Sequence, residues 1–214
     1  MNIAVIGTGH IGRTLGTAWA KAGHEVSYGV RDTSSANARA AVEEARDAKG
    51  SVRLTGIEQA ADFGDVILFA VPARALPSVL STVRTHLENR VLIDATNNVG
   101  AQTMHSLEAL RDAGGHQAVY ARAFSNLGYE NFAHPQIGGE QIDLIYCADA
   151  GPATEKGSGL ADLISDVGLR PVWLGDSRKA DLIDALTRVW FSLALEQGRG
   201  RRIALKLLQK SETE

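Results

Sequence analysis

Short apolar runs along the chain are each followed by a stretch in which apolar residues recur every three or four positions. Such runs are typical of buried strands, and such spacing is typical of one helix face. Strands are predicted at residues 3–6, 26–30, from 52, 65–72, 90–98, 116–124, 142–148 and 170–175. Helices are predicted at residues 11–22, 36–48, 57–63, 73–87, 104–113, 153–167 and 182–194. This alternation predicts an α/β fold: a doubly wound, mostly parallel Rossmann sheet with a small C-terminal region of helix and strand.

A glycine-spaced turn joins the first predicted strand to the first predicted helix. It contains Gly7, Gly9 and Gly12, with Thr8, His10 and Ile11 between them. Gly7 permits a sharp turn, Gly9 leaves the backbone open to a pyrophosphate, and Gly12 lets the helix pack closely on the strand. An ordinary glycine turn is the alternative, but the strand-turn-helix context favours a dinucleotide site at the helix N-terminus.

The end of the second predicted strand bears on the choice of cofactor. Arg31 can form a forked contact with a 2′-phosphate, and Thr33, Ser34 and Ser35 add hydroxyl donors. Asp32 lies where an NAD site carries its ribose-binding acid. We favour NADP; the alternative is that Arg31 and Asp32 form a solvated turn whose serines cap the next helix.

Two further strand ends are expected at the same edge of the sheet. The first carries Ala70, Val71 and Pro72, which are predicted to line the cofactor because Pro72 cannot continue the strand. The second carries Thr96 and Asn97, which are predicted to meet the nicotinamide ribose, while Asp94 is expected to cap the turn or to bind ligand.

An aromatic and polar loop follows the predicted strand at residues 116–124. Its candidates for substrate contact are Ser125, Asn126, His134 and Pro135, although His134 has an equal claim to a structural role. We expect a dinucleotide-binding domain over residues 1–135 and a smaller domain over residues 136–214 that completes the cleft.

Charge and composition exclude several classes of partner. The 214 residues carry a net charge of −3 with interspersed signs, which favours neither nucleic acid nor a membrane surface. No apolar run reaches membrane-spanning length and the first residues enter a strand at once, so a cytoplasmic enzyme is expected. The single cysteine, Cys147, precludes an internal disulfide and fits a buried strand position. The apolar residues 203–208 suggest burial against a second subunit, so a homodimer is expected.

These motifs, in order, resemble the NADPH-dependent reductases of the deazaflavin coenzyme F420. The resemblance rests on residues 6–12, 30–32, 70–72, 93–97 and 123–126. Similar dinucleotide-binding proteins include pyrroline-5-carboxylate reductases and the oxidoreductase domain of metalloreductases. The resemblance implies hydride transfer between nicotinamide and a deazaflavin or flavin. It also implies that Thr8, Arg31 and Ser34 meet the NADP phosphates and that Asn126, His134 and Pro135 face the deazaflavin.

The residues themselves agree with this chemistry. Hydride transfer between stacked rings mainly requires proximity, and no acid-base pair or metal-ligand spacing is found among the six histidines. No catalytic residue is therefore assigned. One alternative is an NADP-dependent dehydrogenase or imine reductase assisted by Lys179, and another is an NADPH sensor without turnover.

Overall fold

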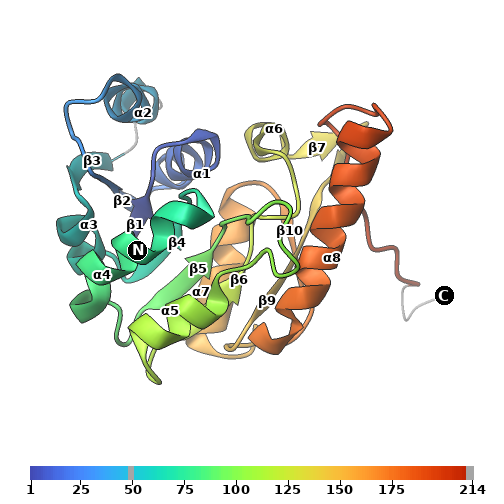
Figure 1. Ribbon diagram of the computed structural model, residues 1–214. Coiled ribbons are helices and arrows are strands. Elements are labelled where there is room, and N and C mark those ends of the chain that lie inside the picture. Colours follow the sequence, from blue (N-terminus) through green and yellow to red (C-terminus); the bar gives the residue numbers. More distant parts are fainter. Residues whose placement is uncertain (48–50, 211–214) are drawn as a thin grey trace.

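A sheet of eight strands forms the centre of the molecule, for which a computed structural model describes residues 1–47 and 51–210 (Figure 1). In spatial order the strands are β10 (Arg170–Trp173), β9 (Asp143–Ala148), β6 (Val119–Arg122), β5 (Val91–Asp94), β4 (Val66–Phe69), β1 (Asn2–Ile6), β2 (Glu25–Val30) and β3 (Ser51–Gly56). All neighbours in this sheet are parallel except β6 and β9. The predicted mostly parallel Rossmann sheet is confirmed.

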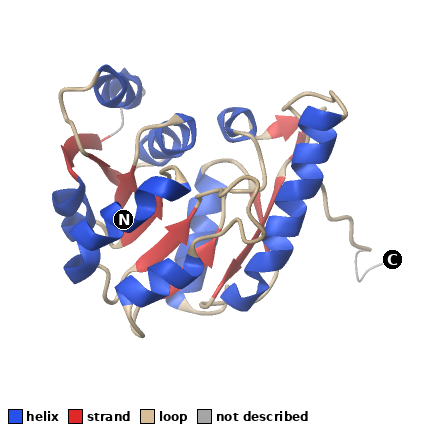
Figure 2. Ribbon diagram, viewed as in Figure 1, coloured by secondary structure: helices blue, strands red, loops and turns tan. Residues whose placement is uncertain are grey.

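Helices cover both faces of the sheet (Figure 2). One face carries α1 (His10–Lys21), α2 (Ala36–Asp47) and α7 (Glu155–Asp166), and the other carries α3 (Ile57–Phe63), α4 (Leu76–Val83), α5 (Leu107–Gly114) and α8 (Ala180–Phe191). Strand side chains alternate between two cores: Ile3 and Val5 belong to the first, and Ala4 and Ile6 to the second. Both faces of the central strands are therefore apolar, which explains their continuous hydrophobic runs.

The strand order creates a crevice next to β1. The chain runs outward from β1 through β2 to β3 and then returns to β4 on the other side of β1. In such sheets ligands bind where the strand order reverses, outside the carboxyl ends of the strands. The crevice therefore lies outside the carboxyl ends of β1 and β4, where the glycine-spaced turn begins.

Several short elements were not predicted from the sequence. They are α6 (Tyr129–Ala133), the hairpin β7 (Gln136–Ile137) and β8 (Glu140–Gln141), the 3₁₀ turns η1 (Ala73–Ala75), η2 (Arg84–His86) and η3 (Ser177–Lys179), and the π-helical turn η4 (Ser192–Glu196). The helix predicted at 73–87 is thus α4 flanked by two 3₁₀ turns, and Pro77 lies in its first turn, where a missing N–H is tolerated.

Most predicted boundaries differ from the structure by a few residues. The helix predicted from residue 153 begins at Glu155, because the side chain of Thr154 caps it by accepting a hydrogen bond from the Gly157 amide. The helix predicted at 36–48 ends at Asp47, and residue 48 lies outside the described residues. Pro171 lies on the edge strand β10, as predicted.

Residues 136–214 contribute β9 and β10 to the same sheet as β1 to β6. The sheet therefore continues across residue 135, and the division into two domains stays a prediction. Within the described part of the chain, no helix combines the length and apolar character needed to cross a membrane.

Candidate dinucleotide site

The glycine-spaced turn folds as its spacing predicts. Gly7 has a φ of +105°, and a Cβ there would lie 2.6 Å from the Ala70 carbonyl oxygen. A Cβ at Gly12 would lie 2.0 Å from the Gly7 carbonyl oxygen, so only glycine lets α1 pack this closely on β1. A Cβ at Gly9 would meet no protein atom within 4 Å. The space in front of the α1 N-terminus is therefore open to a ligand.

A cavity of about 450 Å³ lies beside this turn. Its lining includes eight of the predicted cofactor residues: Gly7, Thr8, Gly9, Arg31, Ser35, Ala70, Val71 and Pro72. Asp32, which the sequence analysis weighed as a ribose-binding acid, also lines the cavity. Seven further lining residues were not predicted: Ile6, Gly29, Val30, Asn37, Ile57, Ala75 and Val79. They lie at the ends of β1 and β2, in η1 and in α2, α3 and α4, and no motif in the sequence marks them as cavity residues. Five other predicted residues flank this cavity without lining it: His10, Ile11, Gly12, Thr33 and Ser34.

In the loop after β2, the Asp32 carboxylate forms hydrogen bonds within the loop itself. One carboxylate oxygen of Asp32 accepts hydrogen bonds from the Ser34 hydroxyl at 2.6 Å and the Ser34 amide at 2.8 Å. These bonds lower the pKa of Asp32. Ser35 accepts a hydrogen bond from the Ala38 amide, so Ser35 caps α2, whereas Ser34 bonds to Asp32. The exposed Arg31 lines the cavity, and its guanidinium has no polar protein partner within the described residues. This arrangement leaves Arg31 available to an anionic group.

The polar side chains after β5 form hydrogen bonds mainly with other groups of the protein. Asp94 is fully buried; it accepts hydrogen bonds from the Thr96 amide, the Thr96 hydroxyl and the Ser106 amide. Asp94 therefore braces the turn, which was one of the two roles expected from the sequence. The Asn97 side chain accepts a bond from Arg122 and donates one to the Ser125 carbonyl. Contact of Thr96 and Asn97 with the nicotinamide ribose stays a prediction.

Sequence analysis missed a buried ion network behind this cluster. Arg122 on β6 is fully buried and lies 2.9 Å from an Asp184 oxygen and 3.4 Å from an Asp94 oxygen. Asp184 is also fully buried. The signal was present as charged residues inside apolar patterns, one in a strand and one in the apolar stripe of α8. The network ties α8 to the carboxyl ends of β5 and β6.

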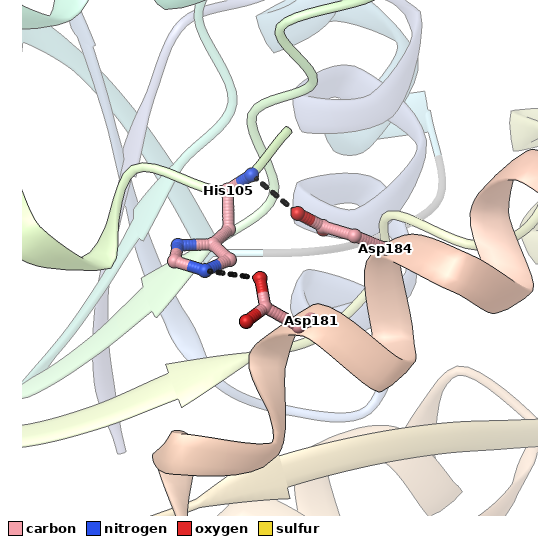
Figure 3. A group of neighbouring side chains, drawn as sticks. All are labelled: His105, Asp181 and Asp184. Carbon is pink, nitrogen blue, oxygen red and sulfur yellow. Dashed lines mark hydrogen bonds and ion pairs between the residues drawn. The ribbon is translucent and has the colours of Figure 1, made fainter. Parts of the chain in front are cut away.

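His105, Asp181 and Asp184 lie together beside this network (Figure 3). The His105 ring lies 3.5 Å from Asp181, and Asp184 accepts the backbone amides of Met104 and His105. Both oxygens of Asp184 are thus engaged by Arg122 and by amides. A cation here would compete with the Arg122 guanidinium, so the group is explained by ion pairing and bracing of the loop before α5.

The loop after β6 separates the four predicted substrate residues. Ser125 and Asn126 are buried at the end of β6, and the Asn126 amide donates to the Ile145 carbonyl. The Ser125 hydroxyl and the Asn126 side-chain carbonyl have no partner among the described residues. His134 is exposed at the far end of α6, and Pro135 lines a different cavity beside α1 and α7. Their contact with substrate stays a prediction.

Tyr129 at the start of α6 connects this loop to the glycine-spaced turn. Its ring stacks on the ring of His10, the first residue of α1, with centroids 4.4 Å apart and planes 14° from parallel. The Arg201 guanidinium also lies near this ring, 5.8 Å from the Tyr129 centroid. His10 is thus engaged with α6 beside the turn.

The structure places Lys179 away from this site. Strand β9 runs antiparallel to β6, so its end approaches the amino-terminal edge of the parallel strands. Asp149, just after β9, accepts the Ser177 amide in the turn that contains Lys179. The dinucleotide cavity lies at the carboxyl edge. Lys179 therefore cannot supply a proton to a substrate there.

Comparisons with known proteins agree with this geometry. Residues 2–98 match the family described as "NADP oxidoreductase coenzyme F420-dependent". This match covers slightly less than half of the chain and includes the glycine-spaced turn. The predicted resemblance is thereby confirmed. The predictions of an NADP-dependent oxidoreductase and of NADP as cofactor are also confirmed, at the level of the family.

The similarity extends beyond the N-terminal part. The F420-dependent NADP reductase of Methanothermobacter thermautotrophicus is 26% identical over 232 residues, which cover 100% of this chain and 97% of the relative. The crystal structure of a provisionally named F420-dependent NADP reductase from Arthrobacter sp. FB24 has a TM-score of 0.81 at 21% identity, covering 98% of this chain and 100% of that one. An imine reductase from Streptomyces aurantiacus has a TM-score of 0.64 at 19% identity, covering 92% and 64%. The two structures show the shared fold.

Proposed function

We propose that this protein transfers hydride between NADP(H) and a deazaflavin of the coenzyme F420 type. The observation that carries the proposal is the end-to-end similarity to a relative named for that reaction, which spans both the dinucleotide site and the C-terminal third. The open N-terminus of α1 would hold the pyrophosphate, and Arg31 would hold the 2′-phosphate.

The protein's part in such a reaction is mainly positioning. Hydride passes directly between two ring carbons about 3–3.5 Å apart, so the site must hold both rings and exclude water. Asp94, Arg122 and Asp184 brace the carboxyl ends of β5 and β6, and β5 is the direct neighbour of β4 in the sheet. The buried oxygens of Ser125 and Asn126, for which the described part of the chain offers no hydrogen-bond partner, are candidates to bind one of the rings.

Purified protein tests the proposal by oxidation of NADPH with candidate acceptors. We expect turnover with coenzyme F420 and much slower turnover with FMN or a cyclic imine. Lys179→Ala is the matched control, and its activity should equal that of the wild type because Lys179 lies at the opposite edge of the sheet. Rapid turnover of the imine alone would refute the proposal. Tight NADPH binding without any acceptor would instead support the sensor alternative.

We also propose that the protein is a cytoplasmic homodimer. The support is a set of exposed apolar side chains on α8, on η4 and near the described C-terminal end, namely Leu182, Val189, Leu195 and Leu208. Sedimentation at micromolar concentration tests the dimer, and a monomer under those conditions would overturn it.

A further inference from the structure

The loop after β2 places two opposite charges next to each other in the wall of the dinucleotide cavity. Arg31 and Asp32 are both exposed, and both line the cavity that Gly7 and Gly9 of the glycine-spaced turn also line. In a Rossmann fold the end of the second strand meets the adenine ribose. The two side chains therefore lie where the 2′-phosphate of NADP is distinguished from the 2′-hydroxyl of NAD.

These two side chains have opposite effects on a 2′-phosphate. A guanidinium without a protein partner binds the phosphate, whereas a carboxylate repels it and instead accepts a hydrogen bond from the 2′-hydroxyl of NAD. A carboxylate that paired with Arg31 would also occupy the donors that the phosphate needs. Among the described residues the Arg31 guanidinium has no polar partner, and Asp32 is not paired with it. A preference for NADP therefore depends on what holds the Asp32 carboxylate.

Ser34 holds this carboxylate through two hydrogen bonds. The Ser34 hydroxyl donates to the Asp32 Oδ1 atom at 2.6 Å, and the Ser34 amide donates to the same atom at 2.8 Å. The hydroxyl bond and then the amide bond lower the pKa of Asp32, so both favour the charged carboxylate. Ser34 does not line the cavity. Its hydroxyl therefore acts on the carboxylate beside the cavity.

From this geometry we infer that Ser34 determines the cofactor preference indirectly: it keeps the Asp32 carboxylate in a hydrogen-bonded turn and so leaves the Arg31 guanidinium to the 2′-phosphate. Ser34 is thus a positioning residue that acts through Asp32. The inference rests on the proposed function, in which Arg31 binds the 2′-phosphate. It also gives Ser34 a different role from the direct phosphate contact that the family resemblance implies.

A double-mutant cycle in the full-length protein tests this role. Ser34→Ala removes the hydroxyl bond and leaves the amide bond. Asp32→Asn keeps an acceptor oxygen for both Ser34 donors and removes the negative charge. The double variant completes the cycle and measures the coupling of the two side chains. Glu43→Gln on α2 is the charge-matched control, because Glu43 is exposed and forms no ion pair with a described residue.

Fluorescence titration gives the Kd for NADPH and for NADH without any acceptor, so the result does not depend on turnover. Ser34→Ala should lower the preference for NADPH over NADH about fivefold, because the Asp32 carboxylate then pairs with Arg31 or with the ribose. Asp32→Asn should raise the preference about threefold, because one repulsive charge is removed. In the Asp32→Asn background, Ser34→Ala should change the preference by less than about twofold. Glu43→Gln should match the wild type.

An unchanged preference in Ser34→Ala would overturn the inference. A loss of the same size in the Asp32→Asn background would also overturn it, because the Ser34 hydroxyl would then act on the phosphate without Asp32. A wild type that binds NADPH no more tightly than NADH would remove the phosphate assignment and, with it, the role of Ser34. A normal preference in the wild type together with an unchanged preference in Ser34→Ala would remove the inference alone.

Discussion

Asp184→Asn removes one charge from the buried network with almost no change in side-chain shape. Asp184 accepts four hydrogen bonds: from the Met104 and His105 amides at 2.8 and 2.9 Å, and from Arg122 at 2.9 and 3.2 Å. An asparagine has one acceptor oxygen. In either orientation its NH₂ group would face donors, from Arg122 or from the two amides. At least one pair of hydrogen bonds is therefore lost.

The size of the effect follows from burial. Breaking a buried ion pair by removing one partner costs about 3–5 kcal/mol, because the remaining charge stays desolvated. Asp94, 3.4 Å from Arg122, retains part of the compensation. We therefore expect a loss near the lower limit, about 3 kcal/mol of unfolding free energy. For a protein of this length that loss lowers the Tm by about 6–12 °C.

Urea denaturation followed by circular dichroism and tryptophan fluorescence measures the loss. Asp181→Asn is the matched control, because Asp181 lies one turn earlier on α8 with its side chain 81% exposed, and among the described residues its ion pair is with His105 alone. Its variant should lose no more than about 0.5 kcal/mol. A loss below about 1 kcal/mol for Asp184→Asn would refute the view that the network depends on this carboxylate.

Three further outcomes follow from the site and its surroundings. Gly12→Ala places a methyl group 2.0 Å from the Gly7 carbonyl oxygen, so NADPH affinity should fall about tenfold or more in a fluorescence titration. Unchanged binding would contradict the view that close packing of α1 on β1 requires glycine at this position. Arg31→Ala should weaken NADPH by about 1.5–3 kcal/mol while changing NADH little, and equal losses would remove the phosphate assignment. Burial tends to raise the pKa of Asp143, but the ion pair with Arg170 outweighs burial and lowers that pKa. The pair therefore stabilises the fold above about pH 4, and this stabilisation is lost on acidification. Asp143→Asn should make the unfolding free energy fall less steeply at acid pH, and an unchanged fall would argue against the pair.

The predictable part of the site was the part made by neighbours in sequence. Gly7, Gly9 and Gly12 lie within six residues, and their roles depend on local backbone geometry, which spacing expresses directly. The cavity-lining residues after β4 were also found, because Pro72 marks the end of a strand and parallel strands end at one edge.

The ambiguous residues were those whose side chains had two possible partners. The sequence allowed Asp32 to bind a ribose or to close its own loop, and Asp94 to bind ligand or to brace a turn. In the structure Asp32 bonds to Ser34, and Asp94 bonds to Thr96 and Ser106. A short side chain near its own backbone amides makes such bonds at little entropic cost, which is why these acids are used locally.

The sequence alone determined the dinucleotide turn, the doubly wound sheet and the resemblance to the F420-dependent reductases, because each depends on local spacing or on short apolar runs. Only the tertiary structure decided the rest. It joined Arg122 to Asp184 across 62 residues, placed Lys179 at the far edge through one antiparallel strand, and brought Arg202 to the end of α6. These contacts pair residues far apart in the chain, and such pairings depend on how the strands and helices are arranged in space, which no local pattern records.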